Sequence, residues 1–174
     1  MLSGFSAGGR SLSAKHLLKN SKKLIILKAF TKLYGMAGVR LGYCLCSDTE
    51  LLARMRAAGQ PWAVSSLAQA AGIAALDETE YVAKVRALIE AQRPVLADGL
   101  RALGLRVIEG RANYLLFRAP EALGEALRRK GAVLRSCGNY PGLDASWYRT
   151  AVRTENENRQ LLALLAETLP EVAQ

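Results

Sequence analysis

Hydrophobic and polar positions along the chain follow the spacing of strands and helices in turn, which predicts an α/β protein. Residues 24–27 form a short apolar run, Leu-Ile-Ile-Leu, typical of a strand buried on both faces of a parallel sheet. Residues 40–46 are predicted to form a second strand after a glycine-containing loop. We expect a ligand site at this loop, because α/β folds bind ligands at strand ends.

Three helices are predicted to follow these strands. Ser47 is the expected N-cap of a helix that ends near Ala58, and Glu50 completes a capping box. Residues 66–76 are small and apolar on all sides, so this helix is expected to be buried. Residues 78–103 form one long helix, ended by Gly104, that is long enough to link two domains.

The remaining residues predict a compact α/β unit. Strands are expected at residues 105–108, 114–117, 132–135 and 147–153, with a helix at 120–130. A final helix begins at Thr154, where Thr-x-x-Glu forms a second capping box with Glu157.

Composition limits the classes of protein that fit. The chain has 174 residues, 51% of them apolar, so a sizeable core is expected. No apolar run approaches the roughly 18 residues of a membrane span, and residues 1–10 lack the apolar core of a secretory signal. We therefore predict a soluble, cytoplasmic protein that does not bind a membrane.

The net charge of +9 favours anionic ligands, from phosphorylated small molecules to nucleic acid. The basic residues are scattered rather than striped, and aromatic residues make up only 6%. Because this leaves too few rings for a base-stacking platform, we predict a phosphorylated small molecule and no nucleic acid.

Cysteine and histidine usage argues against several kinds of site. The cysteines are Cys44, Cys46 and Cys137, an odd number without Cys-x-x-Cys spacing, which favours neither a disulfide framework nor a zinc site. His16 is the only histidine, so this chain cannot build a His-based metal cluster or a Ser-His-Asp triad. No metal is expected.

Lys32 and Arg40 are the candidate chemical groups of the glycine-containing loop. A lysine that forms a Schiff base needs a rigid platform and a partly desolvated setting, since only the neutral amine is nucleophilic. Arg40 adds a planar cation suited to bidentate phosphate binding. The alternative for Lys32 is an ordinary solvated loop residue, and the flanking strands favour the first interpretation.

Arg135 and Arg149 are the candidate ligand-binding residues of the second α/β unit. Arg149 lies in the middle of a strand otherwise fit for burial, so it needs an anionic partner. That partner is either a nearby acid, Asp144 or Glu155, or a bound ligand. The turn-rich loop at residues 136–143 lies between the two arginines, and together they could hold a substrate with two anionic groups.

These residues resemble a known family. The first motif is similar to the lysine motif of class I/II aminotransferases, which are fold-type I pyridoxal-phosphate (PLP) enzymes: Thr31-Lys32-x-x-Gly35-x-x-Gly38-x-Arg40-x-Gly42. Two later segments most resemble the threonine-phosphate decarboxylase branch, which is close to the histidinol-phosphate aminotransferases: Val133-Leu134-Arg135-Ser136-Cys137-x-Asn139-Tyr140-Pro141-Gly142-Leu143 and Tyr148-Arg149-Thr150-Ala151-Val152-Arg153-Thr154.

The resemblance implies roles for individual residues. Lys32 would be the Schiff-base lysine, with Thr31 and Arg40 binding the cofactor phosphate. The chain departs from many relatives at Ala29, where they have serine, so one phosphate hydrogen bond is expected to be missing or supplied elsewhere.

The second unit would hold the substrate. By resemblance, Arg149 would bind the substrate α-carboxylate, and Arg135 would bind its phosphate with help from Asn139.

The resemblance also implies the fold, that of the C-terminal part of a fold-type I PLP-dependent transferase. Residues 1–80 would be the C-terminal part of the large PLP-binding domain, including the end of its sheet. Residues 81–174 would be a long linking helix and a small α/β C-terminal domain. Aligned on Lys32, the chain begins just after the aspartate that pairs with the cofactor ring nitrogen. We therefore expect a truncated chain, an altered gene start or a separately encoded N-terminal half, and by family a homodimer with shared sites.

The implied activity is PLP-dependent decarboxylation of L-threonine O-3-phosphate to aminopropanol phosphate in cobalamin biosynthesis. This chain would carry the half with the Schiff-base lysine and, lacking a complete active site, would be inactive alone. The alternatives are a histidinol-phosphate-type aminotransferase and, in another class, a non-catalytic module that folds or dimerises without PLP turnover.

Overall fold

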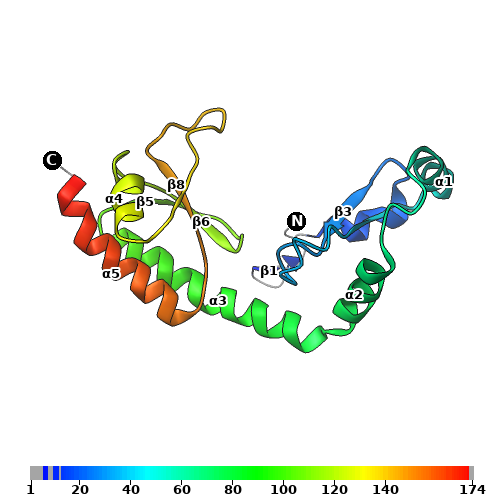
Figure 1. The fold of residues 1–174 in the computed structure, drawn as a ribbon, viewed down its shortest axis with the longest axis horizontal. Coiled ribbons are helices and arrows are strands. Elements are labelled where there is room, and N and C mark those ends of the chain that lie inside the picture. Colours follow the sequence, from blue (N-terminus) through cyan, green and yellow to red (C-terminus); the bar gives the residue numbers. More distant parts are fainter. Residues whose placement is uncertain (1–5, 8–9, 12, 173–174) are drawn as a thin grey trace. The chain divides into compact units, whose positions relative to one another are not determined.

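The protein is described by a computed structural model that covers residues 6–7, 10–11 and 13–172 (Figure 1). It divides into two compact units, residues 1–85 and residues 86–174. We call them the first unit and the second unit and describe each by itself. The division falls inside the long helix α3 (Thr79–Ala102), as does the domain boundary expected after residue 80.

The first unit contains short strands and helices. Its elements are β1 (Ser6–Ala7), β2 (Arg10–Ser11), the 3₁₀ helix η1 (Ala14–Asn20), β3 (Ile26–Ala29), β4 (Gly42–Leu45), α1 (Thr49–Ala58), α2 (Ser66–Asp77) and the start of α3. Strands β1 and β2 pair antiparallel, as do β3 and β4.

The prediction that the first apolar strand is buried in a parallel sheet is wrong. Strand β3 pairs antiparallel with β4, in a register that places Ala29 opposite Gly42, and the two form a sheet of their own. Leu27 on β3 is 70% exposed. In this two-stranded sheet β3 has an unpaired edge, and no described element covers the face that carries Leu27.

Helix α1 begins one residue later than the capping box predicts. The N-cap is Asp48, whose carboxylate accepts a 2.9 Å hydrogen bond from the backbone N–H of Leu51. The hydroxyl of Ser47 instead donates to the carbonyl of Ser21. The predicted end of α1 is confirmed, since Gly59 is its C-cap.

Helix α2 forms where the sequence predicts it, but it is not buried on all sides. Only Ala68, Gly72 and Ala75 are buried. Three large apolar side chains of α2 are exposed: Leu67 by 83%, Ile73 by 67% and Leu76 by 53%. Helix composition predicted burial, but burial also requires neighbouring elements, and the described residues cover only one side of α2.

The second unit is a four-stranded antiparallel sheet packed on helices. After the rest of α3 come β5 (Arg106–Ile108), β6 (Tyr114–Arg118), α4 (Leu123–Arg129), β7 (Arg135–Ser136), β8 (Trp147–Ala151) and α5 (Glu155–Val172). The strand order is β5-β6-β8-β7. Strand β7 begins at Arg135, where the sequence predicted the strand to end, because its pairing with β8 involves only Arg135 and Ser136.

Side chains of strands β6 and β8 alternate between two faces, as is usual for a β-strand. Leu115 and Phe117 on β6, and Tyr148 and Thr150 on β8, are buried. The opposite face carries Arg149, which is partly exposed. One face of the sheet is therefore core, and the other is available to a ligand.

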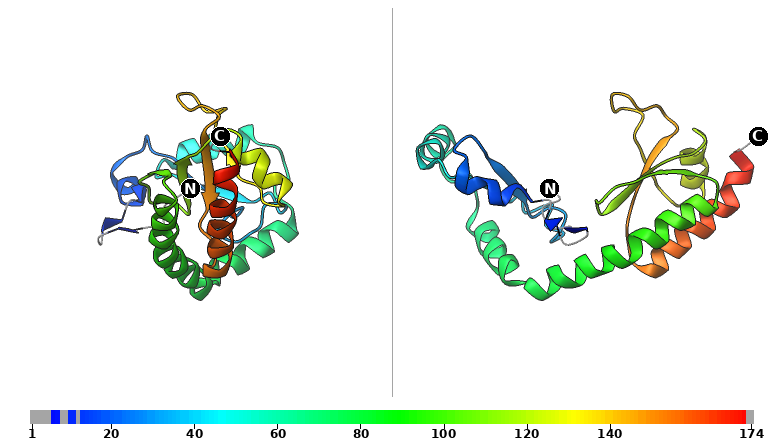
Figure 2. Two further views of the ribbon diagram at one scale, coloured as in Figure 1. Left: turned by 90° about the vertical axis from the view of Figure 1, so that its left-hand side faces the viewer. Right: turned by 180° about the vertical axis from the view of Figure 1, so that it is seen from behind.

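Helices α3 and α5 cover the core face of this sheet. Figures 1 and 2 show α5 running beside the C-terminal half of α3. The approach is close at Gly99, where an added Cβ would lie 2.4 Å from the Cδ1 of Leu162. Gly104, with a φ of +78°, ends α3 as predicted. The capping box at the start of α5 is confirmed, since Thr154 and Glu157 bond each other reciprocally.

None of the helices described here has the length and apolar character needed to cross a bilayer.

Candidate functional site

Strands β3 and β4 hold together the two ends of the loop that carries Lys32. The backbone N–H of Phe30 donates to the carbonyl of Leu41, and the N–H of Met36 donates to the carbonyl of Phe30, each over 3.3 Å. Phe30 is 4% exposed, and its ring lies 5.3 Å from that of Tyr34 and 5.7 Å from that of Tyr43. The buried ring of Phe30 thus anchors the loop just before Thr31 and Lys32.

Lys32 and Arg40 both lie on the exposed part of this loop. Lys32 is in a turn at residues 31–34, and Thr31 beside it is partly exposed. Arg40 precedes β4, has a φ of +56° and donates from its guanidinium to the carbonyl of Ala37 over 3.2 Å. The expected desolvated setting of Lys32 is absent from the described residues, because none of them forms a wall over the turn.

The groups on this loop fit PLP. A primary amine can bind its aldehyde carbon, while a guanidinium and a hydroxyl can bind its phosphate. The backbone also leaves room, since a Cβ built at Gly35 or Gly38 would meet nothing within 4 Å. A positive φ at a residue other than glycine is uncommon and often marks a functional position. Arg40 is such a residue.

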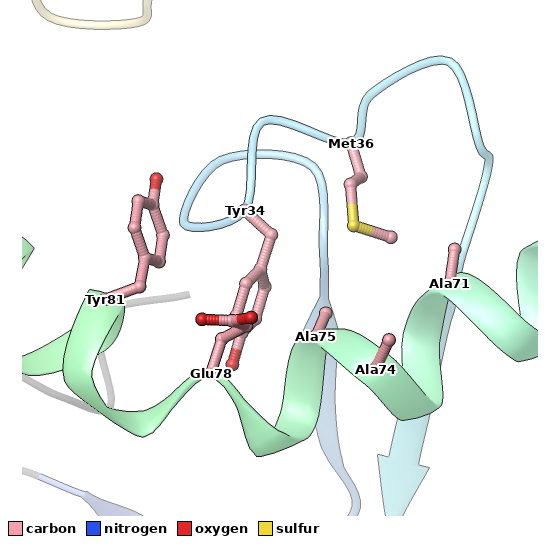
Figure 3. A pocket seen from close by; sticks show the side chains of 7 residues that line it. All are labelled: Tyr34, Met36, Ala71, Ala74, Ala75, Glu78 and Tyr81. Carbon is pink, nitrogen blue, oxygen red and sulfur yellow. The ribbon is translucent and has the colours of Figure 1, made fainter.

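A second set of side chains supports the loop from α2 and α3. Figure 3 shows Tyr34 and Met36 from the loop above α2, with Tyr81 on the first turn of α3. The Tyr81 hydroxyl donates a 2.9 Å hydrogen bond to the carbonyl of Leu33, and its ring stacks on Tyr34 at 6.3 Å. The sequence gives no signal for this contact, because its partners are 48 residues apart and Tyr81 lies outside the motif that contains Leu33.

In the second unit, Arg135 and Arg149 are directly opposite each other on β7 and β8. Residues paired in this way project to the same face of a sheet, and two like charges in such a pair are destabilising. Neither arginine forms an ion pair with any acid that the structure describes. An anion bound between them would relieve the repulsion.

The internal salt bridge considered for Arg149 is not formed. Asp144 lies 3.7 Å from Arg118, and Glu155 pairs with Arg159 at 2.5 Å. The guanidinium of Arg149 instead lies over the ring of Tyr114, 4.7 Å from its centroid. Tyr114 is a diagonal neighbour on β6, so this contact depends on strand register and has no local signal in the sequence.

Asn139 lies on the exposed loop between these arginines. The backbone of Tyr140 donates to the carbonyl of Cys137, and Gly142 has a φ of +84°. The side chain of Asn139 has no hydrogen-bond partner among the residues described. Cys137, at the start of this loop, is only 3% exposed.

Three groups of the second unit have shifted pKa values, and none of the three is a candidate site residue. The hydroxyl and N–H of Ser146 hold the pKa of Asp144 below its usual value. Thr154 lowers the pKa of Glu157 in the same way. The ammonium of Lys130 donates hydrogen bonds to the carboxylates of Glu167 and Glu171, and these bonds raise the pKa of Lys130.

The candidate residues therefore form two groups. Thr31, Lys32 and Arg40 share one loop of the first unit, and Arg135, Arg149 and Asn139 share one strand pair and its loop in the second. Within residues 6–7, 10–11 and 13–172, no cluster of three or more His, Cys, Asp or Glu side chains could hold a metal ion.

The regions matched in comparisons with known proteins include both groups. The family model for aminotransferase class I and II matches residues 3–165. The chain is 38% identical over 160 residues to threonine-phosphate decarboxylase of Salmonella typhimurium, covering 90% of this chain and 44% of that protein. It is 37% identical over 161 residues to histidinol-phosphate aminotransferase of Symbiobacterium thermophilum, covering 91% and 44%. The chain spans less than half the length of these relatives.

Solved structures agree with this similarity. The histidinol-phosphate aminotransferase of Clostridium acetobutylicum matches with a TM-score of 0.84 and 31% identity, over 90% of this chain and 48% of that one. The enzyme of the same name from Sinorhizobium meliloti, solved in complex with pyridoxal-5'-phosphate, matches with a TM-score of 0.72 and 25% identity, over 93% and 44%. The fold is thus a partial fold-type I aminotransferase.

Proposed function

The chain belongs to the aminotransferase class I and II family, and we propose that it carries the lysine-bearing half of a threonine-phosphate decarboxylase. The cofactor of this family is PLP. The proposed reaction is decarboxylation of L-threonine O-3-phosphate to aminopropanol phosphate, a step of cobalamin biosynthesis. We further propose a cytoplasmic homodimer that binds neither nucleic acid nor membranes.

The observation that carries this proposal is that Arg135 and Arg149 lie opposite each other and that neither forms an ion pair with a described acid. L-Threonine O-3-phosphate has two anionic groups, a carboxylate and a phosphate. Arg149 would bind the carboxylate and Arg135 the phosphate, with Asn139 as an additional donor. The contact with Tyr114 supports this assignment, because the cation–π attraction holds the Arg149 guanidinium over the Tyr114 ring before a ligand arrives.

In the first unit, Lys32 would attach the cofactor covalently, and Arg40 and Thr31 would bind its phosphate. Bound PLP would supply the electron sink for bonds at the substrate Cα. By holding both anionic ends, Arg149 and Arg135 would fix the rotation of the substrate and so decide which Cα bond breaks. This is an orientation effect, and small errors in such positioning are costly in rate.

A histidinol-phosphate-type aminotransferase is the second candidate. Its support is the 37% identity to the Symbiobacterium enzyme, close to the 38% identity to the decarboxylase. Amino-group transfer from histidinol phosphate to 2-oxoglutarate, with no carbon dioxide released, would favour it.

Cofactor attachment is the first test. PLP and borohydride should label Lys32 in the wild-type chain, as located by mass spectrometry of peptides, and Lys32→Ala should abolish the label. Lys23→Ala is the matched control, since Lys23 is an exposed lysine of the same unit. A chain that forms no such adduct, with or without Lys32, would support a non-catalytic module that folds or dimerises without PLP turnover.

Substrate binding is the second test. Arg135→Gln and Arg149→Gln should each weaken phosphothreonine binding about tenfold or more, because hydrogen bonds to charged groups contribute roughly 1.5–3 kcal/mol. Arg129→Gln is the control, an exposed arginine of α4. Equal binding by all three variants would remove the arginine pair from the site.

Turnover is the third test, and it concerns completeness of the site. Because the chain spans 44% of the length of each of the two relatives named above, we propose that it has little activity alone and requires an N-terminal half supplied as a separate polypeptide. Robust carbon dioxide release from the chain with only PLP and phosphothreonine would refute this.

A further inference from the structure

Tyr81 makes a long-range contact with the turn that carries Lys32. Its hydroxyl donates to the carbonyl of Leu33, the residue directly after Lys32, over 2.9 Å. Its ring stacks on Tyr34 with 27° between the planes. Both contacts come from one side chain on the first turn of α3, so Tyr81 holds the turn at two points.

Apart from Tyr81, the turn is supported by the buried ring of Phe30, which lies 5.3 Å from that of Tyr34, and by two long hydrogen bonds. Its own closing bond, from the N–H of Gly35 to the carbonyl of Lys32, is 3.4 Å long, and the bond from Met36 to Phe30 is 3.3 Å. Both are longer than typical N–H···O bonds, so the hydroxyl of Tyr81 makes the shortest hydrogen bond to this turn.

Packing beneath the turn is also incomplete. A hollow of about 320 Å³ lies between the loop and α2, lined by Tyr34, Met36, Ala71, Ala74, Ala75, Glu78 and Tyr81 (Figure 3). The alanines facing the loop are too short to fill this hollow. The turn is therefore held from α3 by a hydrogen bond and a ring contact rather than by a close-packed floor.

We propose that Tyr81 is a positioning residue for Lys32, and this inference rests on the proposed function of Lys32. The Lys32 side chain is exposed and its described neighbours do not restrain it, so the backbone path of the turn sets where its amine can reach. Fixing Leu33 fixes that path. A covalent cofactor attachment gains rate from such pre-organisation.

Hydrogen exchange tests the contact without any cofactor. In Tyr81→Phe, which keeps the ring and loses the hydroxyl, the amides of Gly35 and Met36 should exchange about fivefold faster, as expected for loss of one neutral hydrogen bond. Tyr34→Phe is the matched control, because the Tyr34 hydroxyl bonds no described residue and lines the same hollow. Unchanged exchange in Tyr81→Phe would overturn the proposal.

Labelling by PLP and borohydride tests the consequence for Lys32. The ratio of the Lys32 labelling rate to that of Lys23 in the same sample should fall two- to fivefold in Tyr81→Phe and stay unchanged in Tyr34→Phe. Faster exchange with an unchanged ratio would reduce Tyr81 to a structural residue and overturn the proposal. Failure of Lys32 labelling in the wild type would instead remove the proposed function, while hydrogen exchange would still report the Tyr81 contact.

Discussion

The two units differ in how completely their elements cover one another. In the second unit, fully buried side chains come from α3, β6, α4 and α5: Leu96, Leu100, Phe117, Leu123, Leu127, Leu165 and Thr168. In the first unit, Phe30 is the only large apolar side chain among those described that is buried. Trp62, Leu67 and Leu27 of that unit are 97%, 83% and 70% exposed.

The proposed substrate-binding residues lie in the well-packed unit, and the proposed cofactor-binding residues lie in the other. Arg135 and Arg149 lie on a sheet whose other face is a finished core, so their spacing is fixed by strand register. Lys32 lies on a loop whose support is a strand pair, the side of α2 and one tyrosine. The substrate-binding half should therefore be formed before a ligand arrives, and the cofactor-binding half should be the more easily disturbed.

The largest expected effect is on folding of the separated units. Residues 79–174, which include all of α3, should unfold in one cooperative transition in urea, because they contain the buried core. Residues 1–85 alone should show no such transition, since they bury too little apolar area to offset chain entropy. Circular dichroism and amide NMR dispersion of the two peptides measure this contrast. A cooperative transition of residues 1–85 would contradict the proposed difference in core packing between the two units.

The next effect is a core truncation in the second unit. Phe117→Ala should destabilise that unit by about 3–5 kcal/mol, because a fully buried ring is replaced by a cavity. Leu67→Ala on α2 is the control, and its exposed side chain should change the unfolding free energy by less than about 0.5 kcal/mol. Urea unfolding of both variants gives the comparison. A large loss in Leu67→Ala would mean that α2 is covered in solution.

The fold could be predicted from sequence where the signal is local. The capping box of Thr154 and Glu157, the end of α1 at Gly59 and the strand at residues 114–117 were each predicted from a few neighbouring residues. The burial of α2 and the pairing of β3 depend on which elements lie beside them. Composition carries no information on that, so these two predictions failed.

The candidate site follows the same rule. The motif around Lys32 and Arg40 is local and identified the loop. Two supporting contacts, Tyr81 to Leu33 in the first unit and Arg149 to Tyr114 in the second, join residues far apart in sequence. They exist only once strand register and helix placement are set, so sequence reasoning could name the chemical groups but not their supports.

Two helix glycines that lie against leucine side chains, Gly99 in the second unit and Gly72 in the first, allow a comparison with a smaller expected effect. A Cβ at Gly99 would meet the whole end of Leu162, with contacts of 2.4, 2.9 and 3.3 Å. At Gly72 it would meet one methyl of Leu41 at 2.4 Å, with the next atom 3.7 Å away. Leu162 lies in the packed helix pair of the second unit, so Gly99→Ala should cost about 1–3 kcal/mol despite the better helix propensity of alanine.

Gly72→Ala should cost less than Gly99→Ala. A rotation of the Leu41 side chain can move its one close methyl away. Alanine also stabilises a helix interior by up to about 1 kcal/mol relative to glycine. Thermal unfolding of both variants against wild type measures the difference. Equal losses would mean that the loop of the first unit is packed as tightly as the helix pair of the second.

The smallest expected effect is a pH dependence at the start of α5. Hydrogen bonds from Thr154, with Arg153 nearby, lower the pKa of Glu157 from its ordinary value of 4.5. A carboxyl with a lowered folded-state pKa stabilises the fold above its unfolded value, and this stabilisation is lost as pH falls through the folded value. Glu157→Gln should therefore lower the urea midpoint of the second unit slightly at neutral pH, and the difference from wild type should shrink as the pH falls below 4.5 and through the lowered folded-state pKa. Glu121→Gln, an exposed glutamate beside α4, should show neither change. A Glu157→Gln difference that persists in acid would assign the effect to helix capping geometry rather than to charge, since glutamine can still accept the Thr154 hydrogen bond.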